Sequence, residues 1–357
     1  MHAARRRAPP TDVQHRLAAS RGCPRPAPVC FPGVGFALPR VSSDRCGGLL
    51  RSLRLGTVRG VAAHTADGID WNSRLADLRR ADGLQAEAVR LVAARLVDGL
   101  PDEPTVVDVG SGAGGMALVL AEALAARGGG TLVLVDAVPE LLDAATAAAR
   151  KAAAYETDSH TTSVRVRPVL GDLSSEQPSS FLPTADLVWA SGVVHHLPDQ
   201  AAVVSALTAS LAPGGLLALA EGGLDARFLP WDIGAGSPGL ADRLSAARGE
   251  WFAHMREKIP GSVRLTKGWG AVLTAAGLRD VSAFSYLVDH PAPTTPQVRD
   301  WALAHVRRLA ESCGERLHPA DRAVLRDLLD SGHPAYLGAR DDLFLLSANT
   351  VHTGRKS

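Results

Sequence analysis

The sequence predicts a doubly wound α/β fold, in which helices cover both faces of a mostly parallel sheet. Short apolar segments alternate with helical segments between residues 105 and 223, and this alternation is typical of parallel sheets. The first apolar segment runs directly into a glycine-rich turn, VVDVGSGAGG at residues 106–115. Sheets of this kind bind ligands at the carboxyl ends of their strands, so we expect the functional site there.

Five strands are expected before residue 224, at residues 105–110, 131–137, 164–172, 185–191 and 216–223. The helices between them include one that begins at Pro139 and one from about 198 to 211, which the sequence APGG ends. Further helices are expected at 71–84, 85–100, 239–257 and 268–278. Late strands at 280–290 and 342–352 enclose an insert, residues 291–341, with two amphipathic helices.

Charge and cysteine content limit the classes of partner. Residues 1–60 contain 11 Arg, no Lys and two acidic residues, which gives +9 and leaves −8 on the rest of the chain. An acidic body argues against a nucleic-acid enzyme, and no apolar stretch reaches the roughly 20 residues that span a bilayer. Cys23, Cys30 and Cys46 lie in this leader without metal-ligand spacing, so we expect no metal site, reduced thiols and a cytoplasmic location. Residues 1–60 are rich in proline and arginine, and this composition predicts that they are disordered.

The glycine run fits two different patterns. Gly110, Gly112 and Gly115 match the dinucleotide fingerprint G-x-G-x-x-G. Gly110, Gly112 and Gly114, with Asp108 ahead of them, match D-x-G-x-G-x-G instead. A dinucleotide site expects an uninterrupted apolar strand before the first glycine. Asp108 breaks that strand, and its carboxylate would repel a pyrophosphate, so it suits a cationic group instead.

Two more carboxylates end the following strands. Asp136 ends the second strand, where it can accept both hydroxyls of a ribose, and Asp172 closes the third. Three acids without a nearby Arg or Lys favour a ligand with a positive centre, an amine and a ribose. S-adenosylmethionine has these features, and Asp108 is then the partner of its amino end, directly or through water.

From about residue 84 to residue 352 the chain resembles the class I (seven-stranded, Rossmann-like) S-adenosylmethionine-dependent methyltransferases. VVDVGSGAGG, LVLVDA, LGDL, ADLVWASGVVHHLPD and LAPGGLLALAE resemble successive motifs of that family, in order. The resemblance implies a seven-stranded sheet with an antiparallel last strand. It also implies that the cofactor is bound by Asp108, Gly110, Ser111, Gly112 and Gly114 at the methionine, Asp136 and Ala137 at the ribose, Asp172 and Leu173 at the adenine, and Ser191 and Gly192 near the sulfonium.

The catalytic residues are less clearly marked. His195 and His196 follow the fourth strand, near the expected methyl acceptor. Either can be a general base, or can shape the wall of the site. Trp231, Trp251 and Trp301 can line the pocket or pack in the core.

The predicted function is methyl transfer by in-line displacement to an O, N or C nucleophile of a small molecule. We expect residues 104–224 to bind the donor, with residues 61–103 forming part of the substrate cap and residues 225–357 the acceptor region. The insert at 291–341 departs from the family pattern. An NAD(P)-dependent oxidoreductase and a non-catalytic methyltransferase-like binding module remain the alternatives.

Overall fold

The computed structural model describes residues 70–154 and 164–357. The chain divides into two units, Met1–Arg59 and Gly60–Ser357, and the described residues all belong to the second. The predicted disordered leader and its three cysteines lie outside the described residues.

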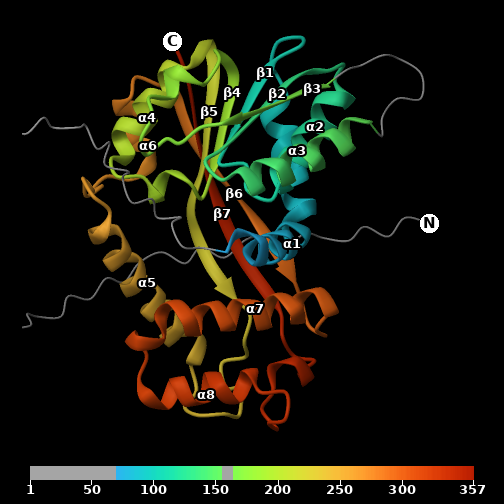
Figure 1. Cartoon of the computed structure of the whole chain (residues 1–357), viewed down its shortest axis with the longest axis vertical. Coiled ribbons are helices and arrows are strands. Elements are labelled where there is room, and N and C mark those ends of the chain that lie inside the picture. The colour runs from blue at the N-terminus through green and yellow to red at the C-terminus, as the bar shows by residue number, and fades with distance from the viewer. Residues whose placement is uncertain (1–69, 155–163) are drawn as a thin grey trace, which may run out of the picture. The chain divides into compact units, whose positions relative to one another are not determined.

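A seven-stranded sheet forms the centre of the described fold, in the order β3-β2-β1-β4-β5-β7-β6 (Figure 1). The first five strands pair in parallel, whereas β7 is antiparallel to both of its neighbours, β5 and β6. This arrangement confirms the predicted fold class. The strands are β1 (Thr105–Val109), β2 (Gly130–Asp136), β3 (Val164–Leu170), β4 (Ala185–Ser191), β5 (Leu211–Arg227), β6 (Arg279–His290) and β7 (Leu345–Arg355).

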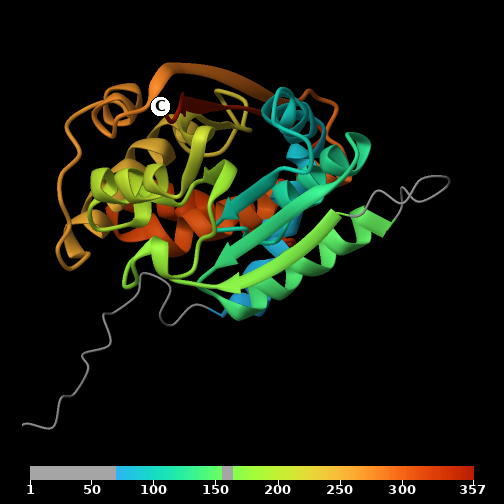
Figure 2. The same cartoon turned by 90° about the horizontal axis from the view of Figure 1, so that it is seen from above.

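Helices cover both faces of the sheet, and further helices lie at the end of the sheet where β5 finishes (Figures 1 and 2). One apolar core joins α1, α2 and α3 to one face, and a second joins α4 and α6 to the other. A third core lies among α5, α7 and α8, next to the end of β5. The helices are α1 (Trp71–Val97), α2 (Gly115–Ala126), α3 (Pro139–Ala154), α4 (Gln200–Ala209), α5 (Leu240–Lys258), α6 (Trp269–Ala275), α7 (Pro296–Cys313) and α8 (Pro319–Leu329). None of the helices in the described part of the chain combines the length and apolarity needed to cross a membrane.

Helix starts follow local chemistry. Asp199 caps α4 by accepting a hydrogen bond from the backbone N–H of Ala202. Thr295 caps α7 in the same way, and Pro296 occupies the first turn, where no backbone N–H is needed. The two helices predicted in the insert therefore form as α7 and α8.

Two element predictions were wrong. Residues 71–84 and 85–100 were expected as two helices, but α1 is continuous. Its Leu84 packs against α7 and its Val89 against the sheet core, and this burial outweighs the roughly 1 kcal/mol that Gly83 costs inside a helix. β5 runs beyond both ends of residues 216–223, because Leu211 pairs with Ala185 of β4 at one end and Arg227 pairs with Leu346 of β7 at the other.

Candidate functional site

The predicted site residues cluster where the sheet reverses its strand order, between β1 and β4. The loop after β1 meets the loop after β4 at Gly110. A Cβ atom on Gly110 would lie 2.2 Å from Val193 Cγ2, so only glycine permits this approach. Switch points of this kind are the usual ligand sites of open α/β sheets.

The glycine turn is held in a conformation that side chains rarely adopt. Gly110, Gly112 and Gly114 have φ of +68°, +54° and +94°. The backbone N–H groups of Gly110 and Ser111 both donate to the carbonyl oxygen of Val135, at 2.7 and 3.0 Å. These bonds fix the loop against the end of β2.

Asp108 lies under this loop and is almost completely buried. Its Oδ2 and the Oγ of Ser111 are the two buried side-chain oxygen atoms of the described residues that lack a hydrogen-bond partner. Burial, and then the charges of Asp136 and Asp82, raise the pKa of Asp108 to about 8. Orphaned buried polar atoms in a native fold call for a partner, here one that the described residues do not supply.

Asp82 is a third carboxylate at the loop, and the sequence analysis missed it. It lies on α1, and its Oδ2 accepts a hydrogen bond of 3.1 Å from the backbone N–H of Gly115, at the start of α2. Burial raises the pKa of Asp82 to about 6. No local motif marks this residue, because its role depends on how α1 packs against α2.

Asp136 lies at the end of β2, beside the same loop. Its Oδ2 accepts from the N–H of Gly112 at 2.9 Å, and its Oδ1 accepts from the N–H of Val138 at 3.0 Å. The backbone of Ala137 also interacts with this carboxylate, and a carboxylate has about four acceptor positions, so acceptor capacity remains for a ribose hydroxyl. Ala137, next to it, is exposed.

The remaining predicted cofactor residues differ in their surroundings. Ser191 and Gly192 are exposed at the end of β4, and the Gly192 N–H donates to the carbonyl oxygen of Ala220. The Asp172 carboxylate accepts bonds from Ser174 and Ser175, so it caps its own turn. Leu173 packs at the margin of the core under α4 and α6.

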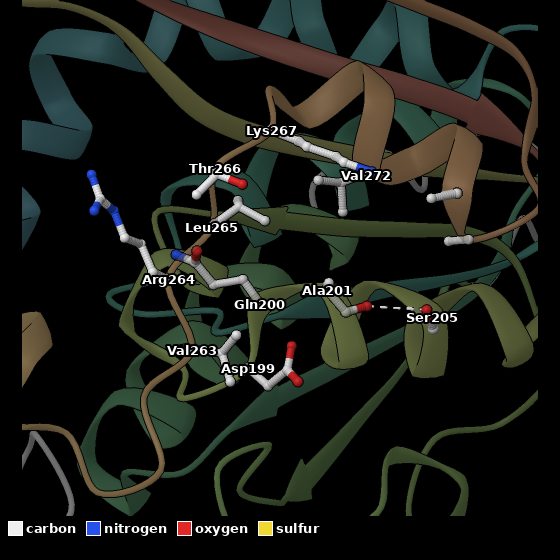
Figure 3. Close-up of a pocket in the computed structure, with 12 residues that line it drawn as sticks. Asp199, Gln200, Ala201, Ser205, Val263, Arg264, Leu265, Thr266, Lys267 and Val272 are labelled. Carbon is white, nitrogen blue, oxygen red and sulfur yellow. Dashed lines mark hydrogen bonds between the residues drawn. The ribbon is translucent and has the colours of Figure 1, made fainter.

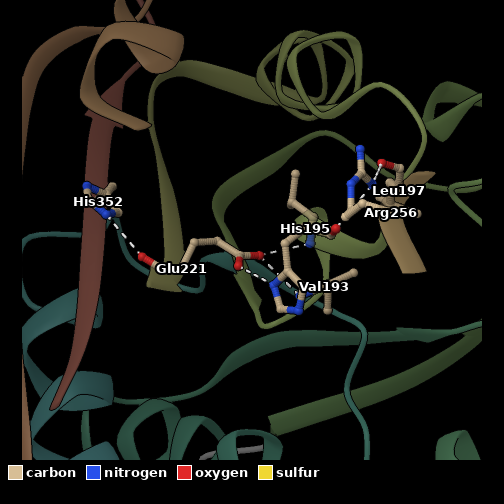
Figure 4. Close-up of polar contacts among 7 residues, drawn as sticks. Val193, His195, Leu197, Glu221, Arg256 and His352 are labelled. Atoms are coloured by element: carbon tan, nitrogen blue, oxygen red, sulfur yellow. Dashed lines mark hydrogen bonds and ion pairs between the residues drawn. The ribbon is translucent and has the colours of Figure 1, made fainter. Parts of the chain in front are cut away.

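His195 is bound by a buried carboxylate (Figure 4). Its Nδ1 lies 2.6 Å from Oε2 of Glu221, which is only 3% exposed. Oε1 of Glu221 accepts from the backbone N–H groups of Val193 and Val194, at 3.2 and 2.9 Å. Because both oxygens are engaged, Glu221 fixes the orientation of the imidazole. The sequence analysis did not single out Glu221, although it ends the LAPGGLLALAE motif.

His196 has different surroundings from its neighbour. Burial, and then His195 and Arg256, lower the pKa of His196 to about 4, so it is neutral at pH 7 and a poor proton acceptor. Arg256, on α5, donates to the carbonyl oxygens of His195, Leu197 and Pro198 and so holds the loop in place (Figure 4).

The three tryptophans have unlike positions. Trp231 is 72% exposed and lies beside Gly239, before α5. Trp301 is buried in the core of α5, α7 and α8, stacked on His305, and Trp251 is half-buried at the edge of that core.

A cavity of about 270 Å³ lies elsewhere, between the start of α4, α6 and residues 263–267 (Figure 3). None of the predicted site residues lines it. The candidate site is therefore the surface around the glycine loop and His195, not this cavity.

These residues fit S-adenosylmethionine better than a dinucleotide. In a dinucleotide site the glycine turn would have to hold a pyrophosphate, but here three acids surround it: Asp82, Asp108 and Asp136. Gly115, the third glycine of the dinucleotide pattern, faces Asp82. The acids instead offer acceptors to a cationic, ribose-containing ligand.

Residues 107–217 match the family model of the methyltransferase domain. The chain carries a methyltransferase domain over these residues. The matched segment contains β1, the glycine turn, Asp136 and the His195 loop. The resemblance predicted from the five motifs is confirmed.

Curated and structural relatives of the methyltransferase domain are distant. Ubiquinone biosynthesis O-methyltransferases from strains of Xanthomonas campestris are 36% identical over 114 residues, which is 32% of this chain. The chain spans 41% of the length of these relatives. A putative methyltransferase from Bacillus halodurans is 18% identical, with a TM-score of 0.40 over 74% of this chain and 98% of that one. A methyltransferase from Thiobacillus denitrificans, in complex with S-adenosyl-L-homocysteine, is 15% identical, with a TM-score of 0.38 over 74% and 90%. At this level of similarity neither activity nor substrate carries over.

Proposed function

We propose that the protein transfers a methyl group from S-adenosylmethionine to a hydroxyl group of a small molecule, with His195 as the general base. The observation that carries the proposal is the carboxylate-bound imidazole beside the glycine loop. Its Nδ1 lies against Glu221 Oε2 at 2.6 Å.

The chain's own residues supply the donor site. The unpartnered Asp108 oxygen and Ser111 hydroxyl would face the methionine end, and Asp136 would accept the ribose hydroxyls. The family resemblance also assigns donor contacts to five further residues, which we keep in the proposal: Ala137, Asp172, Leu173, Ser191 and Gly192. When bound, the donor supplies a methyl group on a sulfonium, an already activated leaving group. The protein then has mainly to align the reactants, which can contribute roughly 7–11 kcal/mol.

His195 takes the proton of the acceptor hydroxyl. An ionised carboxylate can only accept hydrogen bonds, so Glu221 selects the tautomer with hydrogen on Nδ1. Nε2 is then the free acceptor nitrogen. This is the arrangement of a base oriented by a third group. His196, with its lowered pKa, shapes the wall instead.

The acceptor region is assigned to the elements outside the donor loops. α7 packs against both α1 and α5 beside the end of β5, so residues 71–103 and 225–357 would shape the acceptor site. The acidic charge of the body supports a small molecule over a nucleic acid. A cytoplasmic location stays a prediction.

Calorimetric titration of the full chain with S-adenosylmethionine, S-adenosylhomocysteine and NADH tests the donor site. We expect the two sulfur nucleotides to bind and NADH not to bind. Asp136→Ala should abolish this binding, whereas Glu140→Ala, which removes an exposed acid of nearby α3, should not. Binding of NADH alone would favour the oxidoreductase. Donor binding without turnover on any hydroxyl compound would favour a binding module.

A further inference from the structure

A cluster of arginines lies beside the proposed acceptor site, and its members come from three helices. We call it the arginine cluster: Arg74 and Arg80 of α1, Arg248 of α5 and Arg308 of α7, with the acids Asp77 and Asp225 and the imidazole of His305. Figure 1 shows that α7 runs beneath α1 and next to α5.

One carboxylate of the cluster serves three guanidinium groups. Asp77 lies 2.7 Å from Arg80, 3.5 Å from Arg308 and 3.8 Å from Arg74, and only the contact with Arg80 is an ion pair with a hydrogen bond. Asp225 is already engaged by Arg248 and by Ser245. Four cations thus share two close carboxylates, and the further acid near Arg308, Glu311, is exposed. Within the arginine cluster the guanidinium groups therefore outnumber the carboxylates that lie close to them.

Arg308 is the least satisfied member. Its side chain is only 32% exposed, and burial, with Arg74 as the next cause, lowers its pKa. Within the described residues, its one hydrogen bond goes to Nδ1 of His305 at 3.2 Å. A guanidinium can only donate, so His305 Nδ1 accepts and Nε2 carries the hydrogen. Among the described residues, His305 Nδ1 and the more distant Asp77 carboxylate are thus the acceptors found for the Arg308 guanidinium, which has five N–H donors.

Two chain segments connect this cluster to His195. On α5, Phe252 meets the His195 ring edge-on at 5.5 Å between ring centroids, and Arg248 lies one helical turn earlier on the same face. On β5, Asp225 follows Glu221 by four residues, a span of at most about 14 Å. The same helix and the same strand therefore carry both the contacts of the proposed base and members of the arginine cluster.

We propose that Arg308, Arg248 and Arg74 bind an anionic group, a carboxylate or a phosphate, carried by the methyl acceptor. Such a group has acceptor oxygens for the unused guanidinium donors and would balance the excess charge. The proposal rests on the proposed function, because it places the acceptor hydroxyl at His195.

Calorimetry on the full chain with matched probes tests the subsite. The probes are 4-hydroxybenzoate, 4-hydroxyphenyl phosphate and the neutral 4-hydroxybenzamide, titrated with and without saturating S-adenosylhomocysteine. At least one anion should bind about tenfold or more tightly than the amide, since charge-assisted hydrogen bonds are the strong ones. The tighter anion identifies the source of the negative charge.

Variants decide whether the arginine cluster is responsible. Arg308→Gln and Arg248→Gln should each reduce anion affinity toward that of the amide. Arg307→Gln removes an equal charge from an exposed position of α7 and should change nothing. If the Arg308→Gln protein shows no cooperative unfolding in a thermal melt, it is not folded, and Arg248→Gln alone provides the test.

Three results would overturn the inference: no anion binding, equal binding of the amide, or full anion affinity in both cluster variants. Failure of S-adenosylhomocysteine to bind the same samples would instead defeat the proposed donor site. The two failures are therefore distinguishable.

Discussion

Replacing Glu221 by Gln tests the proposed base most directly. The substitution keeps the shape of the side chain but replaces one carboxylate oxygen by an NH₂ group. The amide oxygen must stay on the N–H groups of Val193 and Val194, because the opposite orientation would leave both donors facing an NH₂. The NH₂ group then faces His195 Nδ1, which must accept.

The imidazole consequently changes its tautomer. Hydrogen moves to Nε2, and the nitrogen that was to accept the substrate proton becomes a donor. General base catalysis contributes typically 10²–10⁴-fold, or about 2.7–5.4 kcal/mol of barrier. We expect kcat for a hydroxyl acceptor to fall by about that factor. Both backbone bonds survive, so stability should fall by only about 1 kcal/mol.

The assay is steady-state methyl transfer to an acceptor found by screening hydroxyl compounds, beside calorimetry of S-adenosylhomocysteine and a thermal melt. Asp199→Asn, which keeps the α4 cap but removes a nearby charge, serves as the control and should leave kcat unchanged. Glu221→Ala should instead cost about 2–6 kcal/mol of stability, because it orphans two backbone N–H groups. Unchanged kcat in Glu221→Gln, or a loss explained by weaker donor binding, would refute the mechanism.

Two further predictions concern the donor loop. Burial raises the pKa of Asp108 from its ordinary value of 3.8 to about 8, so the folded state holds a proton that the unfolded state releases, and stability should fall as pH rises from about 4 to about 8. Asp108→Asn should flatten this fall in thermal melts of the donor-free protein, and an identical pH dependence in both proteins would contradict the raised pKa. Gly115→Ala should destabilise by about 1–3 kcal/mol in urea denaturation, because its Cβ would lie 2.5 Å from Asp82 Cγ and displace the carboxylate from the N–H at the start of α2. Gly83→Ala is the control, because its added Cβ would have no atom within 4 Å, and it should stabilise α1 by about 1 kcal/mol. If Gly115→Ala and Gly83→Ala changed stability equally, the Asp82 carboxylate would not be held against the N–H of Gly115.

Periodicity and motif order were enough to predict the sheet. Buried strands such as β1 and β2 are mainly apolar runs, with Asp108 as the one charged residue inside β1, and the intervening helices carry recognisable starts and stops. The glycine turn and Asp136 were predicted for the same reason: both depend on residues next to one another in the chain. Local backbone geometry places them at the end of a strand wherever the fold forms.

Contacts between distant segments decided the rest. Asp82 reaches Gly115 across 33 positions, and Glu221 reaches His195 across 26. The single helix α1 and the long β5 also depend on packing partners far away in the sequence, whose burial outweighs a local glycine or turn signal. The arginine cluster assembles from α1, α5 and α7. The sequence by itself therefore determined the sheet and the glycine turn. Only the tertiary structure decided which carboxylate holds the histidine and which charged side chains of α1, α5 and α7 come together, because these pairings have no local sequence signal.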